Sequence, residues 1–215
     1  MDKLTEAHDQ YKNDLFRKMN FNFIKGKSVL DVGCGDGSDS EIFFKKYGLK
    51  TYGTDVYEHD VIKKDRSFLN FKIGSVFDIP FPDGFFDYVF MHDVLHHVDE
   101  PEQRRDYHIK ALKELKRVVK KDGFVIIVEG NRYNPLFYPH MVLIRNHQHF
   151  PQKYFIDIVS EVYPKAEFRF FECHAYPTRF KFIWKFYDYL MDKFSPKSFL
   201  SYNLSVIDMA KNGDE

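Results

Sequence analysis

The stretch Ser28-Val29-Leu30-Asp31-Val32-Gly33-Cys34-Gly35-Asp36-Gly37-Ser38-Asp39-Ser40 decides the fold of this chain. Its first five residues form a short apolar run with Val at alternate positions, which is typical of a buried parallel strand. Three glycines follow at alternate positions, and Ser38, Asp39 and Ser40 then supply N-cap side chains for a helix. A strand, a glycine turn and a helix in this order bring backbone N–H groups close to a ligand at the helix N-terminus.

Strand and helix patterns alternate along the chain that follows. Short apolar runs predict strands at 28–32, 50–54, 71–74, 86–91 and 123–128, and apolar periodicity predicts helices at 38–47 and 102–119. We expect Lys120-Lys121-Asp122-Gly123 to close the second of these helices, because cations and a glycine suit a helix C-terminus. Such alternation indicates a doubly wound parallel sheet with helices on both faces.

After residue 130 the pattern becomes mostly helical. Helices are expected around 140–146, at 152–163 and at 178–194, and strands at 167–174 and 201–210. These two strands complete a mostly parallel, seven-stranded, Rossmann-like sheet. No linker marks an independent domain, so we expect one domain. Within it, 1–25 forms an N-terminal helix, 28–130 the cofactor-binding core, and 131–215 a substrate-side helical cap with the last two strands.

Composition limits the partners of the chain. Among its 215 residues 44% are apolar and 30% are charged, and 32 Lys and Arg balance 32 Asp and Glu. A formal net charge of zero argues against a general nucleic-acid binder, which carries a basic excess. The two cysteines form no disulfide framework, and no signal peptide or membrane-spanning run is evident. We expect a cytoplasmic protein with no nucleic-acid partner and no stable membrane insertion.

Acidic residues near the glycine loop indicate which ligand it holds. Asp55 follows the second strand, 22 positions after Gly33, where a carboxylate accepts hydrogen bonds from ribose hydroxyls. A dinucleotide fingerprint needs a third glycine where this chain has Ser38, and Asp31 adds a negative charge before the loop. A cofactor with a ribose and an ammonium group but no phosphates fits these residues better than NAD does. S-adenosylmethionine has that chemistry.

Four stretches resemble the motifs of one enzyme family. The glycine stretch at 29–37 resembles the first motif of class I S-adenosylmethionine-dependent methyltransferases, and the block at 75–87 resembles their adenine-contacting block. Leu95-His96-His97-Val98 and the stretch at 115–123 resemble the family's fourth-strand loop and the helix entering its fifth strand. The match covers 28–129. The variant that this chain most resembles is the small-molecule group that includes quinone C-methyltransferases.

The resemblance assigns parts of S-adenosylmethionine to the matching residues. It implies that Gly33 and Gly35 approach the methionine part, that Asp55 binds the ribose hydroxyls, and that Asp78 holds the adenine. The whole implied set, with a lid residue from the N-terminal helix, is Tyr11, Asp31, Gly33, Cys34, Gly35, Asp55, Val56, Val76, Phe77, Asp78 and His92. The implied product is S-adenosylhomocysteine.

Two residues are candidates for a general base. Methyl transfer mainly requires an acceptor held in line with the methyl group, and a base is needed only where the acceptor loses a proton. His92 and Glu129 stand at the carboxyl ends of predicted strands, where open α/β sheets bind ligands. His92 and His96 are spaced as in a zinc motif, but no third ligand is evident, so we expect no metal.

The acceptor is predicted less firmly than the cofactor. Aromatic residues make up 18% of the chain, and the aromatic stretch 178–194 is expected to wall a pocket for a small hydrophobic or aromatic acceptor. An RNA or protein acceptor is one alternative, although His92-Asp93-Val94-Leu95 stands where such enzymes resemble one another in an Asn/Asp-Pro-Pro-aromatic motif. The other alternative is a non-catalytic S-adenosylmethionine-binding module with the 178–194 helix on a membrane surface.

Overall fold

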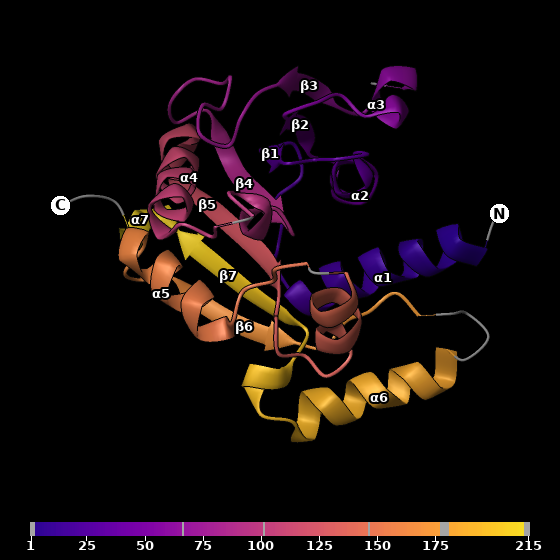
Figure 1. Cartoon of the computed structure of the whole chain (residues 1–215). Coiled ribbons are helices and arrows are strands. Elements are labelled where there is room, and N and C mark those ends of the chain that lie inside the picture. Colours follow the sequence, from indigo (N-terminus) through magenta and orange to yellow (C-terminus); the bar gives the residue numbers. More distant parts are fainter. Residues whose placement is uncertain (1–2, 66, 101, 146, 177–180, 213–215) are drawn as a thin grey trace. The chain divides into compact units, whose positions relative to one another are not determined.

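The helices and strands follow the predicted order (Figure 1). The computed structural model describes residues 3–65, 67–100, 102–145, 147–176 and 181–212. The first elements are α1 (Lys3–Met19), β1 (Ser28–Val32), α2 (Ser38–Tyr47), β2 (Lys50–Asp55), α3 (Asp60–Lys64), β3 (Asn70–Ile73), β4 (Phe86–His92), η1 (Leu95–His97), α4 (Arg105–Val118) and β5 (Val119–Gly130). Then come the π-helix η2 (Tyr138–Ile144), α5 (Gln152–Val162), β6 (Glu167–Phe171), α6 (Lys181–Phe194), η4 (Lys197–Phe199), β7 (Tyr202–Asp208) and α7 (Met209–Asn212). Residues 178–180 of the expected aromatic helix lie outside the described part of the chain.

The strands form one sheet in the order β3-β2-β1-β4-β5-β7-β6. Strands β1 to β5 pair in parallel, and Figure 1 shows β6 and β7 running in opposite directions. The order turns back between β1 and β4, since β2 and β3 lie on one side of β1 and the later strands on the other. Ligands of open α/β sheets bind beyond the carboxyl ends of the strands at such a point. The predicted seven-stranded, mostly parallel sheet is confirmed.

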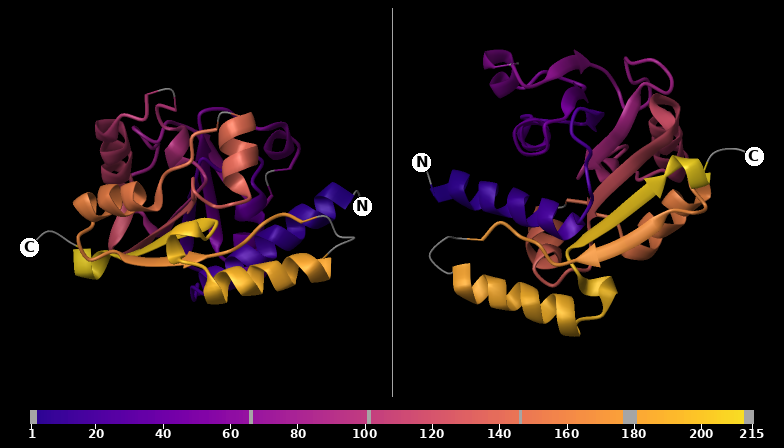
Figure 2. Two further views of the ribbon diagram at one scale, coloured as in Figure 1. Left: turned by 60° about the horizontal axis from the view of Figure 1, so that its bottom comes forward. Right: turned by 180° about the vertical axis from the view of Figure 1, so that it is seen from behind.

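Helices cover both faces of this sheet. Helix α2 contacts β1 and β2, and α4 contacts β4. Figures 1 and 2 show α2 and α4 on opposite sides of β1 and β4. Strand β1 is buried along its whole length, because it lies between two parallel strands and under helices on both faces. The doubly wound arrangement expected from the alternating pattern is therefore confirmed.

The chain packs as two compact units. Unit 1 comprises Met1–Asn22, Glu129–Phe155 and Phe168–Leu204. Unit 2 comprises Phe23–Val128, Ile156–Glu167 and Ser205–Glu215. Unit 2 holds β1 to β4 and most of the predicted cofactor-binding core, and unit 1 holds α1 and α6. The division into N-terminal helix, core and cap stays a prediction.

The junction between α4 and β5 differs from the prediction. Helix α4 ends at Val118 and β5 begins at Val119, so the expected closing residues 120–123 lie in the strand. The pairing of β4 with β5 shifts register between Phe86 and Tyr88. A Cβ on Gly123 would lie 2.7 Å from the carbonyl oxygen of Asp87. Gly123 thus permits a close approach of two strands and does not terminate the helix. The five-residue helix α3 was not predicted.

Asp87 on β4 fastens the start of β1 to the middle of the sheet. Its Oδ2 accepts hydrogen bonds from the backbone N and the Oγ of Ser28, both at 2.8 Å. Its Oδ1 accepts from Lys120 Nζ at 2.8 Å and from Lys27 Nζ at 3.1 Å. Burial acts to raise the pKa of Asp87, but the hydrogen bonds from Lys120, Ser28 and Lys27 outweigh it and hold the pKa well below its usual range.

We expect Asp87→Asn to lower the free energy of unfolding by about 2 kcal/mol at neutral pH, since a charged acceptor of four hydrogen bonds is lost. A carboxyl whose pKa is lowered by folding stabilises the fold at pH values above the pKa that it has in the unfolded chain. This stabilisation is lost as the pH falls through about 4 and below. The difference between variant and wild type should therefore shrink from pH 5 to pH 2. Denaturant unfolding at several pH values measures it.

Asp60→Asn is the control, because the Asp60 side chain is exposed and pairs with Lys63 one helical turn away. A loss of stability for Asp87→Asn no larger than that for Asp60→Asn, at every pH, would contradict the role of Asp87.

Candidate functional site

A cavity of about 550 Å³ opens at the carboxyl ends of β1, β2 and β4. Its lining comes from residues 32–33 after β1, 54–57 at the end of β2, 74–77 after β3, and 92–94 and 97–99 after β4. All of these residues belong to unit 2. A cavity of this size, at the turning point of an α/β sheet, is typical of a small-molecule site.

The glycine loop is joined to the end of β2 by backbone hydrogen bonds. The N–H of Gly33 donates to the Thr54 carbonyl oxygen at 2.8 Å, and the N–H of Gly35 donates to Asp55 Oδ2 at 2.9 Å. Gly33 and Gly35 have φ angles of 70° and 52°, which L side chains rarely adopt. A Cβ on Gly33 would also lie 2.4 Å from Cγ2 of Val94, which lines the cavity. The loop thus keeps its close path because these positions are glycine.

Asp55 lines the cavity with a carboxylate that is already anchored. Besides the bond from Gly35, its Oδ1 accepts from the N–H of Val56 at 2.7 Å. Each carboxylate oxygen has two acceptor sites, so both oxygens keep capacity for a further donor. Asp55 and Val56 both line the cavity, and their contact with a ribose stays a prediction.

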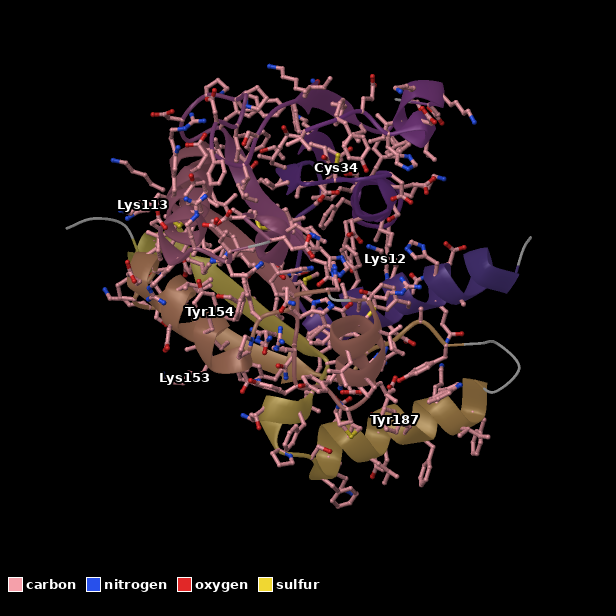
Figure 3. All side chains as sticks on the ribbon, viewed as in Figure 1. Lys12, Cys34, Lys113, Lys153, Tyr154 and Tyr187 are labelled. Atoms are coloured by element: carbon pink, nitrogen blue, oxygen red, sulfur yellow. The ribbon has the colours of Figure 1, made fainter. Side chains whose placement is uncertain are left out.

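Asp31 and Cys34 lie beneath the loop and are not among the cavity-lining residues. Asp31 is almost fully buried, and its Oδ2 accepts a hydrogen bond from the Oγ of Ser40 at 2.7 Å. Cys34 (labelled in Figure 3) belongs to an apolar cluster with Ile62, Phe68, Leu69 and Phe71. Burial raises the pKa of its thiol, which keeps the sulfur protonated. Both side chains support the loop, and a direct cofactor contact for either stays a prediction.

The loop after β3 brings Val76 and Phe77 to the cavity, while the Asp78 side chain is exposed and outside its lining. This loop closes on itself, because the N–H of Asp78 donates to the Ser75 carbonyl oxygen at 3.0 Å. The residues that follow are held from α4. Glu114 Oε1 accepts from the Ile79 N–H at 2.8 Å.

Arg117 is the second anchor of this loop on α4. Its guanidinium donates to the carbonyl oxygens of Ile79 at 2.8 Å and Phe81 at 3.0 Å, and it pairs with Glu114 at 2.6 Å. Sequence reasoning missed both anchors. The only local signal was a Glu and an Arg three positions apart on a predicted helix, which usually marks a surface pair.

His92 at the end of β4 lines the cavity and is held by two acids. Its Nδ1 lies 2.8 Å from Asp39 Oδ2, and its Nε2 lies 3.5 Å from Asp93 Oδ2. Asp39 is buried in the first turn of α2. The contact joins residues 53 positions apart, so the sequence offered no sign of it beyond an acid near a helix N-terminus. His92 thus lies at the cavity, and its contact with the cofactor and its role as a base stay predictions.

Tyr11 and Glu129, the remaining predicted residues, belong to unit 1. The Tyr11 hydroxyl lies 2.5 Å from the Tyr202 hydroxyl. Glu129 is fully buried near the end of β5. Neither is among the lining residues of the unit 2 cavity, so a lid at Tyr11 and a base at Glu129 stay predictions.

The cavity has groups that suit an uncharged polar ligand part. Asp55 presents a carboxylate to it, and residues 76–77 border it. The Asp55 carboxylate and the loop at 76–77 fit a ribose and a flat heterocycle. It offers no cluster of basic side chains for a pyrophosphate among the lining residues.

Comparison with known proteins identifies the region around this cavity. A family model described as a methyltransferase domain matches residues 30–127. The match overlaps the 28–129 stretch that carries the resemblance to class I enzymes, and it includes the last three residues of β1 and all of β2, β3 and β4.

Curated relatives and solved structures resemble the chain beyond this domain. A demethylmenaquinone methyltransferase of a Geobacillus species is 29% identical over 170 residues, which cover 74% of this chain and 65% of that protein. The 2-methyl-6-phytyl-1,4-hydroquinone methyltransferase of a Synechocystis species is 32% identical over 120 residues, or 50% of this chain and 33% of that protein. The chain thus spans less than two thirds of either relative.

The likeness to solved structures concerns the fold. The crystal structure of a SAM-dependent methyltransferase from Archaeoglobus fulgidus has a TM-score of 0.67 at 17% identity, and the alignment covers 93% of each chain. This agreement supports the overall α/β fold.

We expect Gly33→Ala to weaken binding of S-adenosylmethionine at least tenfold, because the new Cβ meets Val94 and strains a loop that borders the cavity. Isothermal titration calorimetry measures the affinity. Gly26→Ala is a matched control, since Gly26 also has a positive φ, of 82°, but has no atom within 4 Å of the added Cβ. Equal affinities of the two variants would contradict the assignment of the glycine loop to the binding site.

Proposed function

We propose that the protein is an S-adenosylmethionine-dependent methyltransferase that acts on a small hydrophobic or aromatic acceptor. The observation that carries the proposal is the unit 2 cavity, in which Gly33, Asp55 and Phe77 meet at the ends of three neighbouring strands. The methyltransferase-domain match spans all three residues.

Different lining residues would contact different parts of the cofactor. Asp55 would accept hydrogen bonds from the ribose hydroxyls. The backbone of 76–77 would border the adenine, in a loop held by Glu114 and Arg117. The glycine loop and the buried negative charge of Asp31 would favour the methionine end, whose ammonium group is positive. A site of this kind is preorganised, because distant side chains fix its backbone.

When bound, S-adenosylmethionine supplies a methyl group activated by its sulfonium. The protein's part is to hold the acceptor in line, exclude water and take up a proton where the acceptor loses one. Asp39 accepts a hydrogen bond from His92 Nδ1 in the tautomer that leaves Nε2 as the basic atom. A proton taken up at Nε2 would be stabilised by the Asp93 carboxylate 3.5 Å away. This makes His92 the preferred base for an acidic hydroxyl or ring carbon.

The curated relatives support the proposed class of acceptor. Their names describe methyltransferases for demethylmenaquinone and for 2-methyl-6-phytyl-1,4-hydroquinone, both of which are small molecules with a ring. The balanced charge of the chain gives no support to a nucleic-acid acceptor. We therefore propose a ring compound with an apolar substituent as the acceptor.

We expect Asp55→Ala to weaken binding of S-adenosylmethionine and S-adenosylhomocysteine by about 10- to 100-fold, because two charge-assisted hydrogen bonds to the ribose are lost. Isothermal titration calorimetry with both compounds measures this. Asp60→Ala, an exposed acid of α3, is the control and should bind like the wild type. Failure of the wild type to bind either compound would refute the cofactor assignment, and binding of NAD in their place would favour a dehydrogenase.

We expect His92→Ala to lower kcat by about 100-fold or more while the affinity for S-adenosylmethionine changes less than threefold, since the residue acts on the acceptor proton. Asp39→Asn should shift the pH profile of kcat and lower kcat less, because the ring remains but its orienting charge is gone. Mass spectrometry of methylated hydroquinones and phenols, with isotope-labelled cofactor, gives the rates. An unchanged kcat in His92→Ala would exclude His92 as the base.

A further inference from the structure

Helix α6 in unit 1 carries an exposed apolar side. The residues at 182, 183, 186, 189, 190, 193 and 194 are all exposed, and they share one face at the spacing of an α-helix. We call this set the outer face of α6. Phe182, Phe194 and Ile183 are 85%, 68% and 60% exposed, which is rare for large apolar side chains on one helix.

The opposite side of α6 binds the rest of unit 1 through aromatic and acidic residues. Trp184 stacks on Tyr176 with ring centroids 4.7 Å apart. Asp188 accepts a hydrogen bond from the Tyr176 hydroxyl. Tyr187, labelled in Figure 3, lies on this inner side near His174, 6.4 Å between ring centroids.

Asp192, the second acid of α6, is exposed but is paired with other residues of unit 1. Its Oδ2 accepts from Lys18 Nζ at 2.6 Å, and its Oδ1 accepts from the N–H of Glu172 at 2.7 Å. The distribution of apolar and acidic residues on this helix is therefore the reverse of that on an ordinary surface helix. Both of its acids are bound by unit 1, and its apolar residues face outward.

The charge left on the outer side is cationic. Lys193 lies within the outer face, with its Nζ 5.3 Å from the Tyr189 ring centroid and 5.4 Å from that of Phe194. Lys185 is exposed beside the face, and Lys197 and the half-exposed Phe199 continue the pattern in η4. Among the described residues of α6, no acid belongs to the outer face.

We propose that the outer face of α6 docks the protein on an anionic lipid surface. Phe, Tyr, Leu and Ile on one face with lysines on and beside it are the composition of helices that lie in the membrane interface. Lysine is depleted at protein–protein contacts, and a two-fold contact of this face with a second copy would bring the lysines of the two faces together. No described helix is long and apolar enough to cross a membrane, so α6 would lie in the plane of the surface.

This docking goes beyond methyl transfer and does not depend on it. It would give an enzyme for an apolar ring compound access to the phase in which such a compound dissolves. The contact would add the buried apolar area of Phe182, Ile183 and Phe186 to the attraction of lysines for anionic headgroups.

Vesicle co-sedimentation tests the proposal on the full chain. We expect the wild type to bind vesicles of phosphatidylglycerol and phosphatidylcholine at least tenfold more tightly than vesicles of phosphatidylcholine alone. The combined variant Phe182→Ser, Ile183→Ser, Phe186→Ser and the charge variant Lys185→Glu, Lys193→Glu should each weaken binding to the anionic vesicles at least tenfold.

Matched controls alter exposed residues of unit 2. The apolar control is Val61→Ser with Ile73→Ser, at side chains 48% and 62% exposed, and the charge control is Lys50→Glu with Lys121→Glu. Both controls should bind vesicles within twofold of the wild type, and circular dichroism melting confirms that every variant is folded.

Three results would overturn the proposal. The first is that the wild type does not bind the anionic vesicles. The second is that the control variants lose as much vesicle binding as the α6 variants. Alternatively, sedimentation velocity would show a dimer that the α6 substitutions dissociate, which would assign the outer face to a second copy. Because the readout is vesicle binding, a failure of the methyltransferase assignment would leave this test intact.

Discussion

The hydrogen bonds between the glycine loop and the end of β2 are the constraint on which the site depends. Parallel pairing of β1 with β2 brings the two strand ends to one edge of the sheet, and Gly33 and Gly35 then donate to Thr54 and Asp55. The same carboxylate that orders the loop also faces the cavity. One acid therefore holds the loop in position and keeps acceptor capacity for a ligand.

The rest of the site is supported from outside its lining. Glu114 and Arg117 hold the loop after β3, and Asp39 holds His92. None of these three is a lining residue of the cavity. A site whose backbone and rings are fixed by such contacts loses little entropy when it binds a ligand. In unit 1, the same kind of polar anchoring leaves α6 with an apolar outer face.

Local signals predicted most of the fold, and long-range contacts account for what they missed. The bounds of β1 and α2 were predicted to the residue, because an apolar run, glycines and serines mark both ends of each. The prediction of the α4–β5 junction was wrong, because the position of Gly123 depends on the approach of Asp87 from the neighbouring strand. The pairing of His92 with Asp39 depends on two distant segments meeting, and no periodicity encodes that.

The central claim is that the unit 2 cavity holds the methyl donor. A crystal structure of the protein with S-adenosylhomocysteine tests it most directly. We expect density for the product in this cavity, with ribose hydroxyls within hydrogen-bond distance of Asp55 and the purine against residues 76–77. Product bound elsewhere on the chain, or bound in the cavity with its ribose away from Asp55, would contradict it.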